Sequence, residues 1–131
     1  MRLLLDTHIA VWAALDPAAL MQTERNIMSD TKDPLVLSAV AVWELRLKWN
    51  SLYVSGDRKG PLHPTAIVTF AAAMSWQLLA LTAAHTTAEL TDPLSHKDPF
   101  DELLLIQAQQ EGMRLLTRDS KLVAHPLAIS G

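Results

Sequence analysis

The sequence has no cysteine, no long apolar run and no excess of basic residues. Without cysteine, disulfides and thiolate metal sites are excluded. No uninterrupted apolar stretch approaches the roughly 18–20 residues that span a bilayer, so we expect no membrane segment. Only three apolar residues separate Arg2 from Asp6, which is too few for a signal peptide, and we expect a cytoplasmic location.

The charge balance limits the ways in which this chain can bind nucleic acid. Fourteen acidic residues stand against eleven basic ones, and the formal net charge is −3. This balance argues against a protein that neutralises long stretches of phosphate, although it leaves room for a short local contact. The positions of the acidic residues along the chain therefore matter more than their number.

The hydrophobic content predicts one folded core. Half of the 131 residues are hydrophobic and 19% are charged, and this length fits a single compact domain over residues 1–131. The mean hydropathy of +0.15 is high for a small soluble monomer. We therefore expect part of the apolar surface to meet a partner.

Short apolar runs alternate with helical patterns along the chain. The predicted strands are 2–5, 35–38, 77–81, 114–117 and an edge strand within 123–129. The predicted helices are one that begins at Thr7, then 17–29, 39–49, 64–76, 83–90 and 99–111, with a surface loop at 55–64. This alternation predicts an α/β fold, a three-layer α/β/α sandwich around a central, mainly parallel sheet.

Two acidic residues directly follow predicted strands. Asp6 and Asp119 come just after apolar runs, and the carboxyl ends of parallel strands form the ligand-binding edge of such sheets. We therefore expect the two carboxylates to meet at one edge. The structural alternatives are a helix N-cap for Asp6 and a turn position for Asp119.

Further acidic residues lie on two predicted helices. Glu44 interrupts the apolar helix 39–49, and an ion pair with Lys48 one turn later is its structural alternative. Asp98 and Pro99 fit the N-cap and first position of helix 99–111. We expect Asp98 to act mainly as a cap or as a neighbour of the ligands, and Asp101 to face a metal.

Four converging carboxylates predict a divalent cation. Asp6, Glu44, Asp101 and Asp119 would repel one another unless a cation neutralised them. Oxygen ligands suit Mg²⁺ or Mn²⁺, which can lower the pKa of a bound water and orient a phosphodiester. The expected reaction is metal-dependent hydrolysis of a phosphodiester bond.

Four motifs in this order resemble those of PIN-domain nucleases, and among them the VapC-like toxins of bacterial toxin–antitoxin pairs. The resemblance covers nearly the whole chain. Its motifs are Leu3-Leu-Leu-Asp-Thr-His8 with Trp12, Ser38 with Trp43-Glu44 and Lys48, His96-Lys-Asp-Pro-Phe-Asp101 with Gln107-Ala108, and Leu115-Leu-Thr-Arg-Asp119.

The resemblance implies an Mg²⁺- or Mn²⁺-dependent endoribonuclease that a cognate antitoxin holds inactive. It also implies a homodimer, and a hydrophobic groove that accepts an antitoxin segment. By position, the acidic quartet is Asp6, Glu44, Asp101 and Asp119, with Asp98 as an additional acid and hydroxyl positions at Thr7 and Thr117. Two residues depart from the pattern, Asn50 in place of a frequent glycine and Glu102 in place of a frequent arginine.

Several other side chains near the acids are candidates for secondary roles. The possible phosphate contacts are Arg46, Lys48, Lys97, Arg118 and Lys121, each with a solvated charged face as its alternative. His8 and His96 are cap neighbours or substrate contacts. The tryptophans lie on apolar helical faces and are expected mostly in the core, with an interface role open for one or two: Trp12, Trp43, Trp49 and Trp76.

Three other interpretations remain open at this stage. The same fold can serve as a catalytically inactive interaction module in which the acids act as caps and partner contacts. A receiver-like signalling domain also places acids at strand ends, but it needs adjacent acids where this chain has Asp6-Thr7. A nuclease acting on single-stranded DNA or in rRNA processing would show the same acids.

Overall fold

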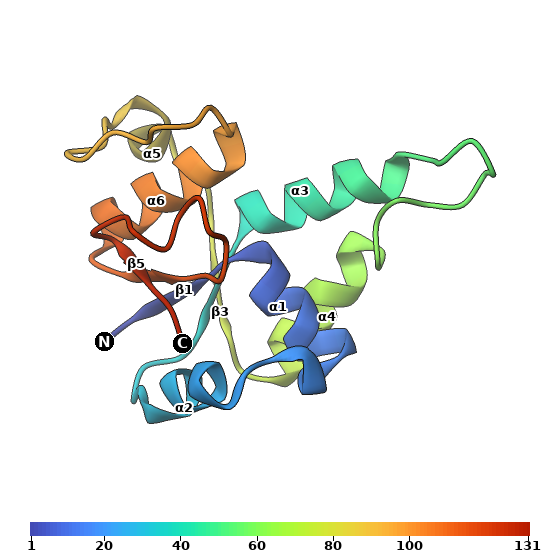
Figure 1. Ribbon diagram of the computed structural model, residues 1–131, viewed down its shortest axis with the longest axis horizontal. Helices are drawn as coiled ribbons and strands as arrows, with labels where there is room; N and C mark the ends of the chain where they lie inside the picture. Colours follow the sequence, from blue (N-terminus) through green and yellow to red (C-terminus); the bar gives the residue numbers. More distant parts are fainter.

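The computed structural model describes residues 1–131 and has a five-stranded parallel sheet at its centre (Figure 1). The strand order is β3-β2-β1-β4-β5, and every neighbouring pair is parallel. The strands are β1 (Leu3–Leu5), β2 (Val36–Ser38), β3 (Gln77–Leu79), β4 (Arg114–Leu116) and β5 (Ala128–Ile129). The predicted parallel sheet is confirmed.

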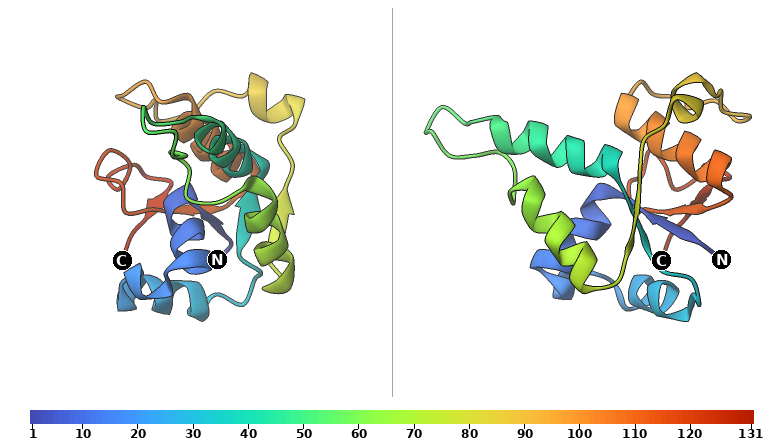
Figure 2. Two further views of the ribbon diagram at one scale, coloured as in Figure 1. Left: turned by 90° about the vertical axis from the view of Figure 1, so that its right-hand side faces the viewer. Right: turned by 180° about the vertical axis from the view of Figure 1, so that it is seen from behind.

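Helices cover both faces of this sheet, as Figures 1 and 2 show. Helices α1, α2 and α4 lie on one side, and α5 and α6 lie on the other. The helices are α1 (Thr7–Leu15), α2 (Gln22–Asp30), α3 (Ala39–Asn50), α4 (Pro64–Ala73), α5 (Ala83–Thr87) and α6 (Pro99–Glu111), with a short 3₁₀ helix η1 (Pro17–Ala19). The predicted three-layer α/β/α sandwich is therefore confirmed.

The core divides into two clusters because successive strand residues point to opposite faces of the sheet. Leu5 packs in the cluster that includes residues of α1 and α4, whereas Leu4 packs in the cluster that includes residues of α6. Helix α3 contributes to both, through Leu45 on one side and Val40 on the other. Since α3 joins the two layers, the position of its polar residues at the sheet edge is tightly determined.

Three helices begin with polar caps at the edge of the sheet that the acids occupy. Asp6 accepts a hydrogen bond from the Thr7 backbone N–H (2.8 Å), and Ser38 accepts one from the Val40 N–H (2.9 Å). Asp98 starts α6 in the same way. Because such caps satisfy backbone donors that have no partner in the helix, they set where α1, α3 and α6 begin.

The predicted helix 17–29 was wrong in one respect, because it is broken near its start. Leu20 and Met21 are extended, and they separate η1 from α2. Leu20 is 5% exposed and packs in the same cluster as Leu5. Burial of this side chain therefore accompanies the break in the helical backbone.

Other predicted elements are present but shorter. Helix α4 ends at Ala73, just before Ser75 adopts a positive φ of 58°, and α5 has only five residues. In the predicted edge strand, Val123 donates its N–H to the Asp119 carbonyl in a turn, which leaves only β5 as strand. None of the helices combines the length and apolarity needed to cross a membrane.

Candidate active site

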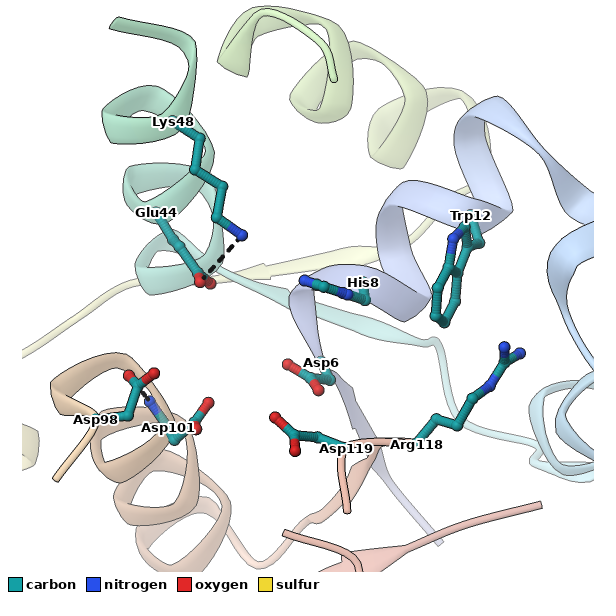
Figure 3. A pocket seen from close by; sticks show the side chains of 9 residues that line it. All are labelled: Asp6, His8, Trp12, Glu44, Lys48, Asp98, Asp101, Arg118 and Asp119. Carbon is teal, nitrogen blue, oxygen red and sulfur yellow. Dashed lines mark hydrogen bonds and ion pairs between the residues drawn. The ribbon is translucent and has the colours of Figure 1, made fainter. Parts of the chain in front are cut away.

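The acidic residues singled out in the sequence line one cavity of about 490 Å³, which Figure 3 shows from close by. They come from the ends of β1 and β4, from the middle of α3 and from the start of α6. The lining residues are Asp6, His8, Trp12, Glu44, Lys48, Asp98, Asp101, Arg118 and Asp119. Four segments that are distant in the sequence therefore place carboxylates around a single space.

Asp6 lies at the bottom of the cavity and is only 9% exposed. Its Oδ2 accepts a hydrogen bond from the Thr117 hydroxyl (2.6 Å), while its Oδ1 caps α1. Burial raises the pKa of Asp6, and the hydrogen bonds from Thr117 and Thr7 oppose that rise. The Asp6 carboxylate therefore both caps α1 and lines the cavity.

Glu44 faces Asp6 from α3 (Figure 3). Its Oε1 accepts a hydrogen bond from the Thr7 hydroxyl (2.6 Å), and its Oε2 lies 3.5 Å from the Lys48 Nζ. The i,i+4 ion pair considered as a structural alternative therefore forms, yet both of its members line the cavity. The two interpretations of Glu44 are compatible.

Asp98 and Asp101 enter the cavity from the first turn of α6. Asp98 Oδ1 accepts hydrogen bonds from the backbone N–H groups of Phe100 (2.9 Å) and Asp101 (3.1 Å). Asp101 Oδ2 lies 2.9 Å from the His96 Nε2. Burial raises the pKa of Asp101, and the charges of neighbouring acids add to that rise against the hydrogen bond from His96.

Asp119 follows β4 and combines a turn role with a pocket position. Its Oδ1 accepts the Lys121 N–H (2.9 Å), and its own N–H donates to the Thr117 hydroxyl oxygen (3.1 Å). Thr117 is fully buried and donates its hydroxyl hydrogen to Asp6. One threonine side chain therefore links the two acids that follow β1 and β4.

The match to a known family decides what this fold is. Residues 3–126 match the PIN domain family. The chain belongs to this family. PIN domains are generally nucleases and typically use divalent metals.

Two solved structures share the fold over nearly their whole length. VapBC2 from Rickettsia felis, bound to a DNA fragment from their promoter, has a TM-score of 0.65 and 19% identity, and the match covers 100% of this chain and 98% of the other. DNA-bound VapBC from Salmonella typhimurium has a TM-score of 0.63 and 14% identity, with coverage of 100% and 97%. No curated protein matches the chain.

In this PIN domain, Arg118, one of the candidate phosphate contacts, is already paired with another residue. Arg118 Nη2 and Nε lie 2.5 and 3.0 Å from the two carboxylate oxygens of Glu24, which is fully buried. The guanidinium also lies 4.3 Å from the centre of the Trp12 ring and donates to the Ala19 carbonyl. Arg118 therefore forms a wall of the cavity, paired with Glu24, and is neither a free phosphate contact nor part of a fully solvated face.

Three further basic candidates lie outside the acidic cavity. Arg46, Lys97 and Lys121 are exposed and do not line it.

The two departures from the family pattern lie outside the acidic cavity. Asn50 is the last helical residue of α3, and Glu102 is exposed beside a different hollow.

The tryptophans divide between the core and the surface. Trp76 is buried, and Trp12 and Trp49 are half-buried. Trp43 is 55% exposed and lines two apolar hollows beside β3, so it is the exception to the core packing expected for most of the tryptophans. Its position leaves the interface role open.

The chemistry of the cavity suits a hard divalent cation, although no group of three or more acidic or histidine side chains stands close enough together to hold one ion. The donors are carboxylate oxygens, which Mg²⁺ and Mn²⁺ prefer. Asp6, Asp98 and Asp119 each raise the pKa of Asp101 through their negative charges. A cation would relieve that repulsion, so the residue types fit a metal.

Sequence reasoning missed one residue beside the site, Glu24, and the contact that a second residue makes. Glu24 gave no sign of its pairing with Arg118, because 94 residues separate them. His96 was considered as a cap neighbour or substrate contact, whereas it hydrogen-bonds Asp101, and its Nδ1 is buried without a partner. Only the spacing of His96 five residues before Asp101 hinted at this contact.

Proposed function

We propose that this protein is a metal-dependent endoribonuclease and the toxin of a toxin–antitoxin pair, with residues 1–131 forming one PIN nuclease domain. The observation that carries the proposal is the convergence of acids from four segments on one cavity at the carboxyl edge of the sheet. The acids are Asp6, Glu44, Asp101 and Asp119. Both structural neighbours are VapBC proteins, which favours a toxin within the family.

The same four carboxylates would hold Mg²⁺ or Mn²⁺. A bound ion would supply positive charge for the scissile phosphate and activation of a water nucleophile. The four acids stand on different elements, so the sheet edge orients them independently of one another. Asp98 lies beside them mainly as the cap of α6.

Two threonine hydroxyls hold the carboxylates in place. Thr7 donates to Glu44, and Thr117 donates to Asp6. Each hydroxyl occupies one of about four acceptor sites of its carboxylate. The Thr7 N–H on Asp6 and the Lys48 ammonium beside Glu44 take another, and acceptor sites remain for a cation. The threonines therefore orient ligands without competing for them.

His96 and Lys48 complete the polar surroundings. A proton on His96 Nε2 directed at Asp101 holds that carboxylate toward the cavity. Lys48 is the only lysine that lines the cavity, at the side where α3 continues away from the sheet. It provides positive charge where a phosphodiester chain would enter.

The exposed apolar surface supports the proposed protein partners. Trp43 and Leu78 line a hollow of about 330 Å³, and Trp43 and Leu81 line another of about 270 Å³. Apolar hollows of this kind fit an antitoxin segment or a second copy of the chain. We expect the toxin to form a homodimer and to act on RNA in the cytoplasm.

An inactive interaction module on the same fold is the second candidate. One observation favours it, because Asp6 and Asp98 cap helices and Asp119 closes a turn, so these acids stabilise the fold without any reaction. Membership of the PIN family removes the receiver-like alternative.

The test is cleavage of a mixed pool of single-stranded and structured RNA with Mg²⁺, Mn²⁺ or EDTA. Asp6→Asn serves as the contamination control, and Glu102→Gln as a matched control, since it removes one negative charge at an exposed position outside the cavity. Metal-dependent cutting that Asp6→Asn loses and Glu102→Gln keeps is the expected result. No cutting by pure, metal-loaded protein would favour the inactive module.

A further inference from the structure

The segment between α3 and α4 projects from the body of the molecule, as Figures 1 and 2 show in green. We call residues 49–63 the arm. Its backbone is ordered as a hairpin, with an antiparallel bridge between Leu52 and Arg58 and a hydrogen bond from the Tyr53 N–H to the Asp57 carbonyl (2.8 Å). The arm therefore presents its side chains in a defined arrangement.

Aromatic rings and cations are paired along the arm. The Arg58 guanidinium lies 4.5 Å from the centre of the Trp49 ring and donates to the Trp49 carbonyl (2.7 Å). The Lys59 Nζ lies 5.5 Å from the centre of the Tyr53 ring. Tyr53 remains 56% exposed. Exposed rings beside cations are the elements with which proteins stack bases and contact phosphates of single strands.

The charge of this segment is opposite to that of the whole chain. The arm contains two basic residues, Arg58 and Lys59, and one acidic residue, Asp57, whereas the chain carries a net charge of −3. In the cavity, Arg118 is paired with Glu24 and Lys48 with Glu44. RNA bound at the acids therefore needs other cations for its neighbouring phosphates, and the arm has them.

A continuous surface joins the arm to the acids. A second hollow of about 200 Å³ shares His8, Trp12 and Lys48 with the acidic cavity. Pro61, which belongs to the arm, also lines this hollow. A strand leaving the cavity along this hollow would reach the base of the arm.

We propose that the arm binds the single-stranded RNA on one side of the cleavage point, with a base stacked on Tyr53 and a phosphate against Lys59. This rests on the proposed nuclease function and adds the surface that holds the substrate. The acids position the bond that is cut, and the arm supplies affinity for the strand beside it.

The test measures binding of a fluorescein-labelled single-stranded RNA by anisotropy, in the Asp6→Asn protein so that the RNA stays intact. Tyr53→Leu should raise Kd about fivefold or more, and Tyr53→Phe should retain binding because stacking needs the ring. Lys59→Ala should reduce the slope of log Kd against log salt by about 0.7, the loss of one phosphate contact. Lys32→Ala is the matched control, an exposed lysine in the loop before β2.

Cleavage and sedimentation in the wild-type background separate the arm from the site. Tyr53→Leu should raise KM by a factor similar to that in Kd and leave kcat within about twofold, because the arm does not touch the reacting bond. Equal RNA binding by all arm variants, with cleavage still present, would overturn the arm's role and leave the nuclease intact. Arm variants that change the oligomeric state would also overturn it, since the arm would then contact a second copy. Wild-type protein that neither binds nor cuts RNA would remove both proposals.

Discussion

Two groups of buried carboxylates in this molecule have opposite electrostatic environments. Glu24 is fully buried and accepts hydrogen bonds from Arg118, which lower its pKa. Asp6 and Asp101 lie across the cavity wall from that pair, and burial raises their pKa. The fold supplies Glu24 with an arginine, and it pairs neither Asp6 nor Asp101 with a lysine or an arginine.

The difference separates a structural acid from candidate catalytic acids. A buried charge without a cationic partner is costly, so a fold retains one only where another requirement opposes that cost. Glu24 ties α2 to the segment that carries Asp119, through Arg118. Asp6 has a hydroxyl partner and Asp101 has an imidazole partner, and each partner orients its carboxylate.

The largest effect is expected when one of the uncompensated acids loses its charge. Asp6→Asn or Asp101→Asn should lower the RNA cleavage rate about a hundredfold or more, because a lost metal ligand removes several kcal/mol of charge stabilisation. Asn can still cap α1, so the melting temperature should stay equal or rise. Cleavage rates and thermal melts of the same preparations check this, and a fully active variant would contradict the site assignment.

The paired acid should show the reverse pattern. Glu24→Gln should lower the free energy of unfolding by about 2 kcal/mol, less than for a fully buried ion pair because Arg118 is 35% exposed. Urea denaturation measures it, with Glu89→Gln as a control at an exposed acid. An unfolding free energy equal to that of the wild type would show that the pair has no structural role.

In metal-free protein, the two groups of acids should also differ in how pH changes their contribution to the free energy of unfolding. Because the pKa values of Asp6 and Asp101 are raised from 3.8, the folded state retains protons that the unfolded state releases. Their contribution to the free energy of unfolding therefore falls as the pH rises above about 3.8. The pKa of Glu24 is lowered from 4.5, so its stabilisation is present above that pH and is lost as the pH falls through the folded-state pKa.

Urea denaturation in EDTA, repeated across this pH range, checks both signs. Asp6→Asn should be more stable than the wild type at neutral pH, and the gain should vanish in acid. The loss caused by Glu24→Gln should be greatest at neutral pH and should shrink well below pH 4.5. The same pH trend for both variants would contradict the contrast between the two groups.

The smallest effect is expected at Asp98, which caps α6 and also lines the acidic cavity. Asp98→Ala should cost about 1 kcal/mol of stability through the lost cap of α6, and Asp98→Asn should cost little. Cleavage by Asp98→Asn should fall far less than cleavage by Asp101→Asn. An inactive Asp98→Asn protein with an unchanged melting temperature would place Asp98 among the ligands.

The features predicted well from the sequence depend on local chemistry. Strand runs of apolar residues, a cap at Asp6 and the Asp98-Pro99 helix start are readable from neighbouring residues, and they locate the sheet edge where the acids gather. The break at Leu20 was not predicted, because it accompanies packing against residues far along the chain.

The unpredicted part of the site depends on long-range contacts. From the sequence, Arg118 was a candidate phosphate contact. Its pairing with Glu24 could not be predicted because 94 residues separate the two. Trp43 lies on an apolar helix, yet its side chain faces solvent because no element of this chain covers the hollows beside β3. Local pattern identifies the acids, and only packing shows which charges are already neutralised.

Binding of Mn²⁺ shows directly whether these carboxylates form a metal site. It is measured through the thermal stability of wild type, Asp6→Asn and Glu102→Gln with and without the ion. Binding at about a hundred times Kd stabilises a fold by roughly 2.7 kcal/mol. We expect a rise in melting temperature with Mn²⁺ for wild type and Glu102→Gln and none for Asp6→Asn. An equal rise in all three proteins, or no rise in the wild type, would contradict a metal site formed by these carboxylates.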